Sequence, residues 1–365
     1  MDTTDSIIRF NYDGVCDHCI AFDQAILPHW NNGSSGQASL LRLVEQIKKS
    51  GRNKDFDCII GMSGGVDSSY LTYLATELGL RPLVFHVDGG WNSQEAVNNI
   101  ERLVDKLGLD LFTEVINWEE MRDLQLSFFK SGVPHIDTPQ DHAFFASMYS
   151  FAQKFNVRYI LTGGNYSTEC IRNPIEWMYY QSDDAQLRDI HSKFGSVPLA
   201  TFPLTSIINH KIILPYIKRI KVVRLLDFIP FNKNIAIQTL VEKFGWQPYP
   251  QKHFESRFTR FYEAYWLPRK FGYDTRKVQY SSLILTNQMK REDAIELLKY
   301  PALDEGTSSL EFNYVATKLR IDITELQYYF DSPNKTFRDY RSQSRLYNLG
   351  SRAMQFLGLA FGGKR

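Results

Sequence analysis

One short run of small and hydroxyl residues, Ser63-Gly64-Gly65-Val66-Asp67-Ser68-Ser69, has the residue types and spacing of a phosphate-binding loop. Two adjacent glycines let backbone N–H groups approach an oxyanion closely, because no Cβ intervenes. The serine hydroxyls add donors, and a helix that starts here adds unpaired N–H groups and a partial positive charge. A carboxylate beside a phosphate needs a cation between them, so we interpret Asp67 as a Mg²⁺ contact.

The segments on either side of this run can position it. Phe56–Met62 is apolar, as a buried strand would be, and apolar residues recur at helical spacing from Val66 to Leu78. The alternative is an N-capped helix after a glycine turn, which the Ser-Gly-Gly triplet alone favours. A strand before it and a helix after it favour the phosphate loop. The Walker pattern, which ends in Gly-Lys-Ser/Thr, is absent from this run.

Three further apolar segments, 81–88, 111–116 and 157–162, predict strands, and helical patterns lie between them. This alternation predicts an α/β fold with a doubly wound parallel sheet. Ligands of such sheets bind beyond the carboxyl ends of the strands. We therefore expect the phosphate loop, Asp88 and Gly163 to meet in one crevice, whereas turn or helix-cap chemistry is the alternative for Asp88, Asp141 and Gly163.

The run from Ser63 to Ser68 resembles the pyrophosphate loop of the ATP pyrophosphatases, which cleave ATP to AMP and pyrophosphate and adenylate a carbonyl or carboxyl oxygen. The resemblance implies ATP and Mg²⁺ as cofactors. From their positions along the predicted fold, backbone groups of Phe85–Val87 would contact adenine, Asp88 would hold ribose or Mg²⁺, and Asp141 would be a second metal ligand. The predicted ATP contacts are Ser63, Gly64, Gly65, Asp67, Ser68, Ser69, His86, Val87, Asp88, Gly163, Gly164 and Asn165.

Bulk composition limits the class of protein. The chain has 365 residues, which suggests two domains, and its 42 Lys and Arg balance 41 Asp and Glu. This balance argues against a surface that binds nucleic acid throughout. We expect a cytoplasmic protein, since no export signal opens the chain and no apolar run is long enough to span a membrane. The close pair Cys16 and Cys19 fits either half of a zinc site or two reduced cysteines.

Three regions are predicted: an N-terminal segment with the Cys pair (1–50), an α/β ATP pyrophosphatase domain (51–230) and a helical C-terminal region for substrate or partner (231–365). The α/β alternation fades beyond about residue 200. Residues 252–277 contain seven Lys or Arg and three Asp or Glu, interleaved with aromatic residues. This composition fits a solvated helix face or a pocket for an anionic ligand that contains a ring.

Several motifs together resemble one family, the N-acetyl sugar amidotransferases of bacterial surface-polysaccharide (lipopolysaccharide O-antigen) biosynthesis. These are Asp13-Gly-Val-Cys-x-x-Cys19, the phosphate loop, Asp88-Gly-Gly-Trp-Asn92, Asp137-Thr-Pro-Gln-Asp-His142, Gly163-Gly-Asn165 with Glu169, and Lys252-His-x-Glu-Ser-Arg257-x-x-Arg260. The resemblance extends along nearly the whole chain. It implies a C–N ligase that adenylates the acetamido oxygen of a nucleotide-activated sugar, after which ammonia displaces AMP and gives an acetamidino group.

The resemblance also implies partners and roles. Ammonia would come from a separate glutaminase subunit, similar to that of imidazole glycerol phosphate synthase. The predicted catalytic residues are Asp67, Lys252, Arg257 and Arg260, and the predicted substrate contacts are Asp141, His253, Glu255 and Arg257. Zn²⁺ would bind Cys16 and Cys19. Members of the family carry another Cys pair before a Met-Asp-Thr-Thr-Asp stretch, so either the true start lies upstream of Met1 or half of a four-cysteine site is missing.

Two other functions remain open. A tRNA-thiolating or tRNA-amidating enzyme would use the same adenylation, and the Cys pair and the basic residues of 252–277 are compatible with it. The neutral overall charge and the lack of a recognisable RNA-binding module argue against it. A non-catalytic protein that retains a nucleotide fold is the third possibility, against which the intact run from Ser63 to Ser68 argues.

Overall fold

Five parallel strands form a single sheet in the order β3-β2-β1-β4-β5. The structure, a computed structural model, describes residues 1–356 and the side chains of residues 1–350. The chain moves outward from β1 to β3, then returns to the other side of β1 with β4 and β5. The order therefore reverses between β1 and β4, which confirms the predicted doubly wound α/β fold. The strands are β1 (Cys58–Gly61), β2 (Pro82–Asp88), β3 (Leu111–Val115), β4 (Tyr159–Leu161) and β5 (Lys221–Val223).

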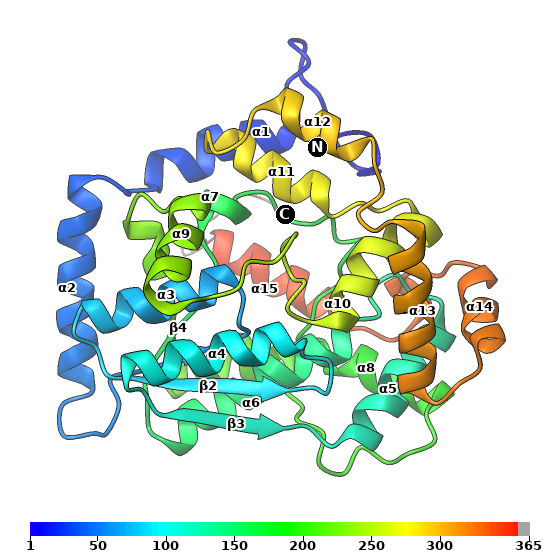
Figure 1. Cartoon of the computed structure of the whole chain (residues 1–365), viewed down its shortest axis with the longest axis horizontal. Coiled ribbons are helices and arrows are strands. Elements are labelled where there is room, and N and C mark those ends of the chain that lie inside the picture. The colour runs from blue at the N-terminus through cyan, green and yellow to red at the C-terminus, as the bar shows by residue number, and fades with distance from the viewer. Residues whose placement is uncertain (357–365) are drawn as a thin grey trace.

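Helices cover both faces of this sheet and extend beyond its carboxyl edge (Figure 1). The helices of the first half are α1 (Asp17–Ala21), α2 (Ser34–Ser50), α3 (Val66–Glu77), α4 (Gln94–Leu107), α5 (Trp118–Ser131), α6 (Thr138–Lys154), α7 (Tyr166–Glu169) and α8 (Asp184–Phe194). Those of the second half are α9 (Lys233–Phe244), α10 (Arg257–Phe261), the π-helix η5 (Tyr262–Phe271), α11 (Arg276–Leu285), α12 (Arg291–Leu298), α13 (Glu305–Leu319), α14 (Ile323–Asp331) and α15 (Ser344–Phe356). Short segments η1 (Phe22–Ile26), η2 (Leu27–His29), η3 (Asn209–Ile217), η4 (Leu225–Phe228) and η6 (Phe337–Asp339) connect them.

The two faces of the sheet bury separate hydrophobic cores, because successive strand residues point to opposite faces. Ile59 and Phe85 enter one core, which α5, α6, α8, α10, η5, α13 and α14 complete. Ile60 and Val84 enter the other, which α2, α3, α4 and α9 complete. The C-terminal helices thus contribute to both cores, and α10 and α13 lie beyond the carboxyl ends of β2 and β3 (Figure 1).

Strand β5 is the element that the fading α/β alternation beyond residue 200 does not reveal. It has three residues, Lys221–Val223, and its side chains are exposed or half-buried. It still extends the sheet, because Ile160 pairs with Val222 in parallel register. Among the helices of residues 1–356, none combines the length and the apolarity that crossing a membrane requires. Residues 357–365 of the predicted C-terminal region lie outside the described part of the chain.

Candidate active site

The predicted phosphate loop joins β1 to α3 at the carboxyl edge of the sheet. Gly64 has a left-handed backbone (φ +84°), which a glycine adopts without strain, and Gly65 is the N-cap residue of α3. A Cβ on Gly163 would lie 2.9 Å from the backbone N of Ser68, so the turn after β4 packs directly on the start of α3. The structure thus brings together the two glycine turns that the sequence predicted to meet.

An anionic oxygen already lies on this loop. The Ser63 hydroxyl donates to Oε1 of Glu255 at 3.2 Å. A Cβ on Gly65 would come within 2.6 Å of the same oxygen, so the missing side chain leaves room for it. The backbone N–H of Gly65 in turn donates to the Ser63 oxygen at 3.2 Å. The residues therefore fit a phosphate group, since the loop accommodates the oxygen of a carboxylate in the same surroundings.

A cationic group lies beside it, between two carboxylates. Lys252 Nζ is 3.2 Å from Oδ2 of Asp67 and also donates to Oε1 of Glu169. Burial opposes the charged ammonium, but the carboxylates of Glu169 and Asp67 outweigh it and raise the pKa of Lys252. Likewise burial opposes charge on Glu169, and Lys252 holds the pKa of Glu169 below its ordinary value. Two carboxylates around one cation are the oxygen donors that Mg²⁺ prefers, so Asp67 and Glu169 fit a metal ion.

The turn after β2 is fixed by its own side chains. Asp88 Oδ1 accepts from the Gly90 N–H at 2.7 Å and from the Asn92 amide at 3.1 Å. His86 joins Asn92 to the strand end: its Nε2 lies 2.9 Å from the Asn92 amide and its Nδ1 lies 2.8 Å from the Met62 carbonyl. The contacts of His86, Val87 and Asp88 with ATP remain predictions, and in this structure Asp88 stabilises the turn.

The same turn binds the basic segment. The Ser93 N–H donates to the Glu255 carbonyl and the Arg257 N–H donates to the Trp91 carbonyl, both at 2.9 Å. Asn92 and Ser256 form an isolated antiparallel bridge. This pairing carries Glu255 onto the phosphate loop, although the two segments are more than 150 residues apart in the sequence.

Arg257 and Arg260 point to a different partner. Both guanidinium groups contact Oε1 of Glu311, a buried residue of α13, at 2.9 Å from Arg257. The Arg257 guanidinium also lies 3.4 Å from the centre of the Tyr314 ring. Within the described residues, the buried Nε–H of Arg260 has no hydrogen-bond partner. These two arginines anchor α10 to α13, and their predicted catalytic roles remain untested.

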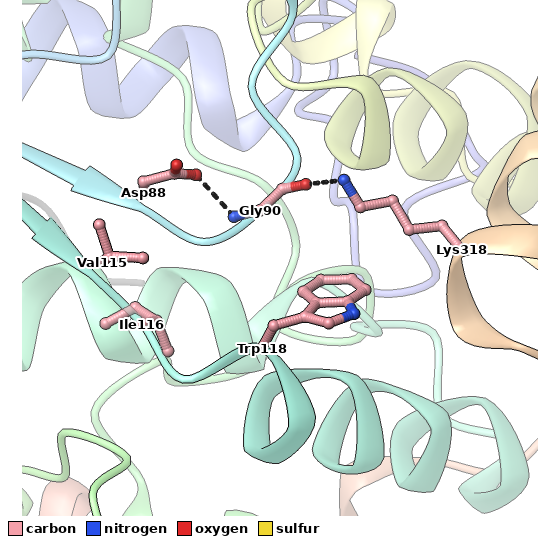
Figure 2. A pocket seen from close by; sticks show the side chains of 6 residues that line it. All are labelled: Asp88, Gly90, Val115, Ile116, Trp118 and Lys318. Carbon is pink, nitrogen blue, oxygen red and sulfur yellow. Dashed lines mark hydrogen bonds between the residues drawn. The ribbon is translucent and has the colours of Figure 1, made fainter.

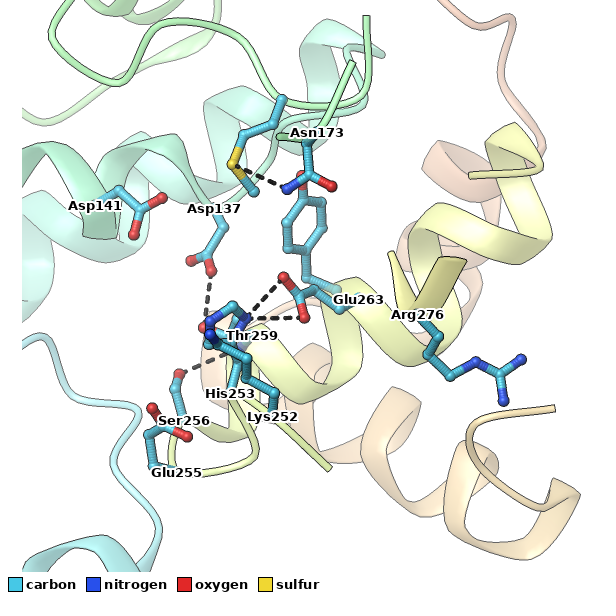
Figure 3. Close-up of polar contacts among 12 residues, drawn as sticks. Asp137, Asp141, Asn173, Lys252, His253, Glu255, Ser256, Thr259, Glu263 and Arg276 are labelled. Carbon is cyan, nitrogen blue, oxygen red and sulfur yellow. Dashed lines mark hydrogen bonds and ion pairs between the residues drawn. The ribbon is translucent and has the colours of Figure 1, made fainter. Parts of the chain in front are cut away.

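His253 lies beside Lys252 and faces a further group of titratable side chains (Figure 3). It has a left-handed backbone (φ +66°), which is uncommon for a residue with a side chain, and its Nδ1 is 3.0 Å from Glu263 Oε1. Burial opposes the charged imidazolium, but Glu263 raises the pKa of His253 to about 9. Burial raises the pKa of Asp141 to about 6, although His253 opposes this shift. Burial and repulsion from Asp141 raise the pKa of Asp137.

Asp141 interacts electrostatically with His253. Its Oδ2 accepts from the Gln181 amide at 3.2 Å, and Figure 3 places it on α6 near Asp137. Asp137 accepts from the Thr259 hydroxyl at 2.8 Å. The structure brings the predicted substrate contacts Asp141 and His253 into one group of charged side chains. The other two lie elsewhere: Glu255 contacts the phosphate loop, and Arg257 forms an ion pair with Glu311.

The Cys pair does not form a recognisable metal site. The Sγ atoms of Cys16 and Cys19 are 3.5 Å apart. In the described part of the chain, no three His, Cys, Asp or Glu residues come together in a way that could hold a metal ion. A structural zinc needs four ligands. The predicted zinc at Cys16 and Cys19 is thus without support, because two thiols are all that this group supplies.

Three residues that interact with predicted site residues are missing from the predicted site list. Glu169 is the second carboxylate beside the Lys252 ammonium. Its position four residues after Asn165 is the sequence feature that could have identified it. Lys233 begins α9 close to Asp67 and Lys252: burial lowers the pKa of Lys233, Asp67 opposes this shift and Lys252 adds to it. Glu311 holds both arginines. Lys233 and Glu311 carried no signal, since each is a single charged residue in an ordinary helical pattern.

Comparison with known proteins supports the predicted family for the C-terminal region. Residues 255–354 match the family model described as the C-terminal domain of WbpG-like lipopolysaccharide biosynthesis proteins. The fold and the loop define an α/β protein with a doubly wound parallel sheet and a glycine-rich turn suited to phosphate. Its C-terminal region carries a WbpG-like domain, which confirms the resemblance there.

Sequence relatives are tRNA-modifying enzymes. The chain is 32% identical over 121 residues to tRNA-specific 2-thiouridylase MnmA 2 of Fusobacterium nucleatum, which covers 30% of this chain and 34% of that protein. It is 28% identical over 123 residues to tRNA-specific 2-thiouridylase MnmA of Clostridioides difficile, covering 29% and 34%. The chain therefore matches about a third of the length of these relatives.

Solved structures that resemble the chain are distant. The NH3-dependent NAD synthetase of Campylobacter jejuni has a TM-score of 0.31 and 12% identity, with 82% of this chain and 98% of that chain covered. The U34-tRNA thiolase NcsA of Methanococcus maripaludis has a TM-score of 0.33 and 14% identity, with 74% and 82% covered. With TM-scores this low, the fold assignment rests on the strand order itself.

Proposed function

We propose that this chain is an ATP-dependent amidotransferase that converts the acetamido group of a nucleotide-activated sugar into an acetamidino group, in lipopolysaccharide O-antigen biosynthesis. One observation carries the proposal. The WbpG-like match begins at Glu255, and the carboxylate of Glu255 accepts a hydrogen bond from Ser63 of the phosphate loop. A domain of the lipopolysaccharide biosynthesis class therefore lies against a loop suited to phosphate.

The reaction is chemically balanced with ATP and ammonia alone. The acetamido oxygen attacks the α-phosphorus of ATP, and the bond to the β-phosphate oxygen breaks, so that pyrophosphate leaves. Ammonia then attacks the amide carbon and loses protons to a base or to water. The carbon–oxygen bond breaks and AMP departs with the former amide oxygen. Adenylation is needed because an amide oxygen is a poor leaving group by itself.

Each part of the site has a role in this reaction. The phosphate loop would hold the β- and γ-phosphates through its N–H groups and hydroxyls. Mg²⁺, when bound to Asp67 and Glu169, would neutralise charge on the leaving pyrophosphate. Lys252 and Lys233 would add positive charge there as the charge develops. When nucleotide enters, Glu255 would therefore have to leave the phosphate loop, and Lys252 would have to leave the carboxylates of Asp67 and Glu169.

Ammonia would come from a separate glutaminase subunit in the cytoplasm. The predicted partner follows from the family resemblance, and the predicted compartment follows from the sequence, in which no export signal was recognised. The basic residues of 252–260 are the predicted contacts for the anionic groups of the sugar. Arg257 and Arg260 have five N–H donors each, so that binding of Glu311 leaves donors for a substrate.

Pyrophosphate release tests this proposal. The purified chain is incubated with ATP, Mg²⁺ and ammonium chloride, across a panel of UDP-linked acetamido sugars and with bulk tRNA as a separate arm. The proposal predicts release that depends on one sugar, with a product in which NH replaces O. An Asp67→Ala variant that remains folded without urea, as judged by circular dichroism, should release none.

A tRNA-modifying enzyme is the second candidate, because the sequence relatives are tRNA thiouridylases. Sulfur transfer through a cysteine requires a thiolate. Burial raises the pKa of the Cys170 thiol to about 11 and that of Cys19 to about 11, and burial also raises the pKa of Cys58. The match of residues 255–354 to the WbpG-like family model favours the sugar amidotransferase. Release that depends on tRNA would reverse this order.

A further inference from the structure

The segment that leads into α10 places one anion and one cation on the phosphate-binding site. Glu255 Oε1 accepts a hydrogen bond from the Ser63 hydroxyl at 3.2 Å. Three residues earlier in the same segment, Lys252 Nζ lies 3.2 Å from Oδ2 of Asp67 and also donates to Glu169 (Figure 3). The carboxylate lies where the loop would bind a phosphate oxygen, and the ammonium lies where two carboxylates would bind Mg²⁺. One short piece of the chain therefore supplies both charges of a magnesium-bound phosphate group.

The space for the anion is part of the loop itself. A Cβ on Gly65 would come within 2.6 Å of Glu255 Oε1, so the carboxylate fills the room that the missing side chain leaves. The hydrogen bonds form a chain, because the Gly65 N–H donates to the Ser63 oxygen and the Ser63 hydroxyl donates to Glu255. A phosphate oxygen and this carboxylate carry the same charge and need the same space. Binding of one therefore excludes the other.

The backbone of Glu255 is tied to the turn after β2. The Ser93 N–H donates to the Glu255 carbonyl at 2.9 Å. The turn is itself held from two sides, as Figure 2 shows: Asp88 accepts from the Gly90 N–H at 2.7 Å, and Lys318 of α13 donates to the Gly90 carbonyl. Rotation of the Glu255 side chain moves its carboxylate off the loop while the backbone stays in place. Such rotations need no opening of the fold.

The other end of the same segment is anchored to the phosphate loop. The Trp246 indole N–H and the Tyr249 hydroxyl both donate to the Gly64 carbonyl at 3.2 Å. The Gln247 N–H donates to Asn99 of α4 at 2.7 Å. Both ends of residues 246–255 are thus fixed against the site. The two charged side chains, and not the segment as a whole, are the parts that can exchange with a ligand.

We propose that Lys252 and Glu255 form an autoinhibitory contact, which mimics a magnesium-bound phosphate and which the nucleotide must displace. This inference rests on the nucleotide site of the proposed function and does not depend on which acceptor is used. The apparent affinity for nucleotide is the intrinsic affinity multiplied by the fraction of chains in which the contact is open. A contact that is closed in about nine of ten chains weakens binding about tenfold. Removing the contact should therefore tighten phosphate binding.

Binding to the full chain tests this contact without catalysis. The probes are inorganic pyrophosphate with Mg²⁺ and, as a ligand without phosphate, adenosine. Each is titrated calorimetrically into wild type, Glu255→Gln and Glu255→Asp. Glutamine removes the charge, whereas aspartate keeps the charge on a side chain that is one methylene shorter and stops short of Ser63. Glu95→Gln, at an exposed glutamate in the first turn of α4, is the matched control.

We expect both Glu255 variants to bind pyrophosphate about tenfold more tightly than wild type and the control, with adenosine affinity unchanged. Lys252→Met should likewise bind Mg²⁺ alone more tightly than wild type does.

Equal pyrophosphate affinity in wild type and both Glu255 variants would overturn the inference and leave the proposed function standing. A gain in Glu255→Gln alone would also overturn it, because charge and not contact would then be the cause. Weaker binding by both variants would show that Glu255 holds the ligand instead of competing with it. If wild type and every variant bind neither pyrophosphate nor adenosine, the nucleotide site is rejected, and the proposed function falls together with the inference.

Discussion

Replacing Lys252 by methionine tests the cation site most sharply. The side chain is 11% exposed, and that of Asp67 is 15% exposed. At 3.2 Å and an effective dielectric constant of about 20, their attraction is about 5 kcal/mol before the cost of burying both ions. Glu169 is 42% exposed, so water screens its share. Removing one partner of a buried pair costs about 3–5 kcal/mol, and we expect about 3 kcal/mol here.

Urea unfolding at neutral pH measures this loss of free energy. Lys299→Met is the control, since Lys299 forms an exposed pair with Glu296 on α12 and its loss should leave the midpoint nearly unchanged. Methionine also leaves Asp67 and Glu169 facing each other without a cation. Millimolar Mg²⁺ should therefore stabilise Lys252→Met more than wild type, since the metal then replaces the ammonium.

The pH dependence has a definite sign. The pKa of Glu169 is lowered in the folded chain, so its contribution to stability is present above its ordinary pKa of 4.5 and is lost as the pH falls through the lowered value. The pKa of Lys252 is raised, so its contribution is lost only at strongly alkaline pH. The difference between wild type and variant should stay constant from about pH 6 to pH 9 and shrink in acid. Equal stability at pH 7, or an equal response to Mg²⁺, would refute the reasoning.

Three further changes test other parts of the site. Gly163→Ala places a Cβ 2.9 Å from the backbone of Ser68, so the loop must shift. We expect pyrophosphate release to fall at least about tenfold and the midpoint of unfolding to fall as well. Unchanged release would contradict the packing of Gly163 on the start of α3. His253→Gln removes a group whose pKa is raised to about 9: its contribution is present below pH 6.5 and lost as the pH rises through about 9. Because that side chain is 38% exposed, wild type should lose only about 1 kcal/mol more than the variant between pH 6 and pH 10, measured by urea unfolding; equal losses would exclude the Glu263 pairing. Glu311→Gln should destabilise the chain by about 2 kcal/mol, because two arginines lose a buried carboxylate. A thermal midpoint equal to that of wild type would show that the packing of α10 on α13 does not depend on this carboxylate.

The sheet was predictable because its central strands are buried on both faces. Ile59, Ile60, Leu83 and Val84 are fully buried, and such continuous apolar runs followed by glycine turns are recognisable in the sequence. Strand β5 was not, because it is short and its edge position leaves Val222 half exposed. Its pairing with β4 gives no periodic signal over three residues.

The site was predictable wherever a backbone feature required a particular residue. Gly64, Gly65 and Gly163 lie where a Cβ would meet other atoms at under 3 Å, and these were the residues that the sequence identified. The partners of long charged side chains were not predictable. Arg257 and Arg260 were expected beside phosphate. In the structure both form ion pairs with Glu311 of α13, which lies more than 50 residues later in the sequence. Sequence composition identifies a basic segment, and only the fold decides which carboxylate it meets.

Tracing the acetamido oxygen tests the central claim most directly. An acceptor sugar whose acetamido carbonyl carries heavy oxygen is incubated with the chain, ATP, Mg²⁺ and ammonium, and the products are analysed by mass spectrometry. The proposed adenylation predicts that the label appears in the phosphate of AMP and that the amidine carries none. Label that remains in the sugar, or that appears in pyrophosphate, would contradict it.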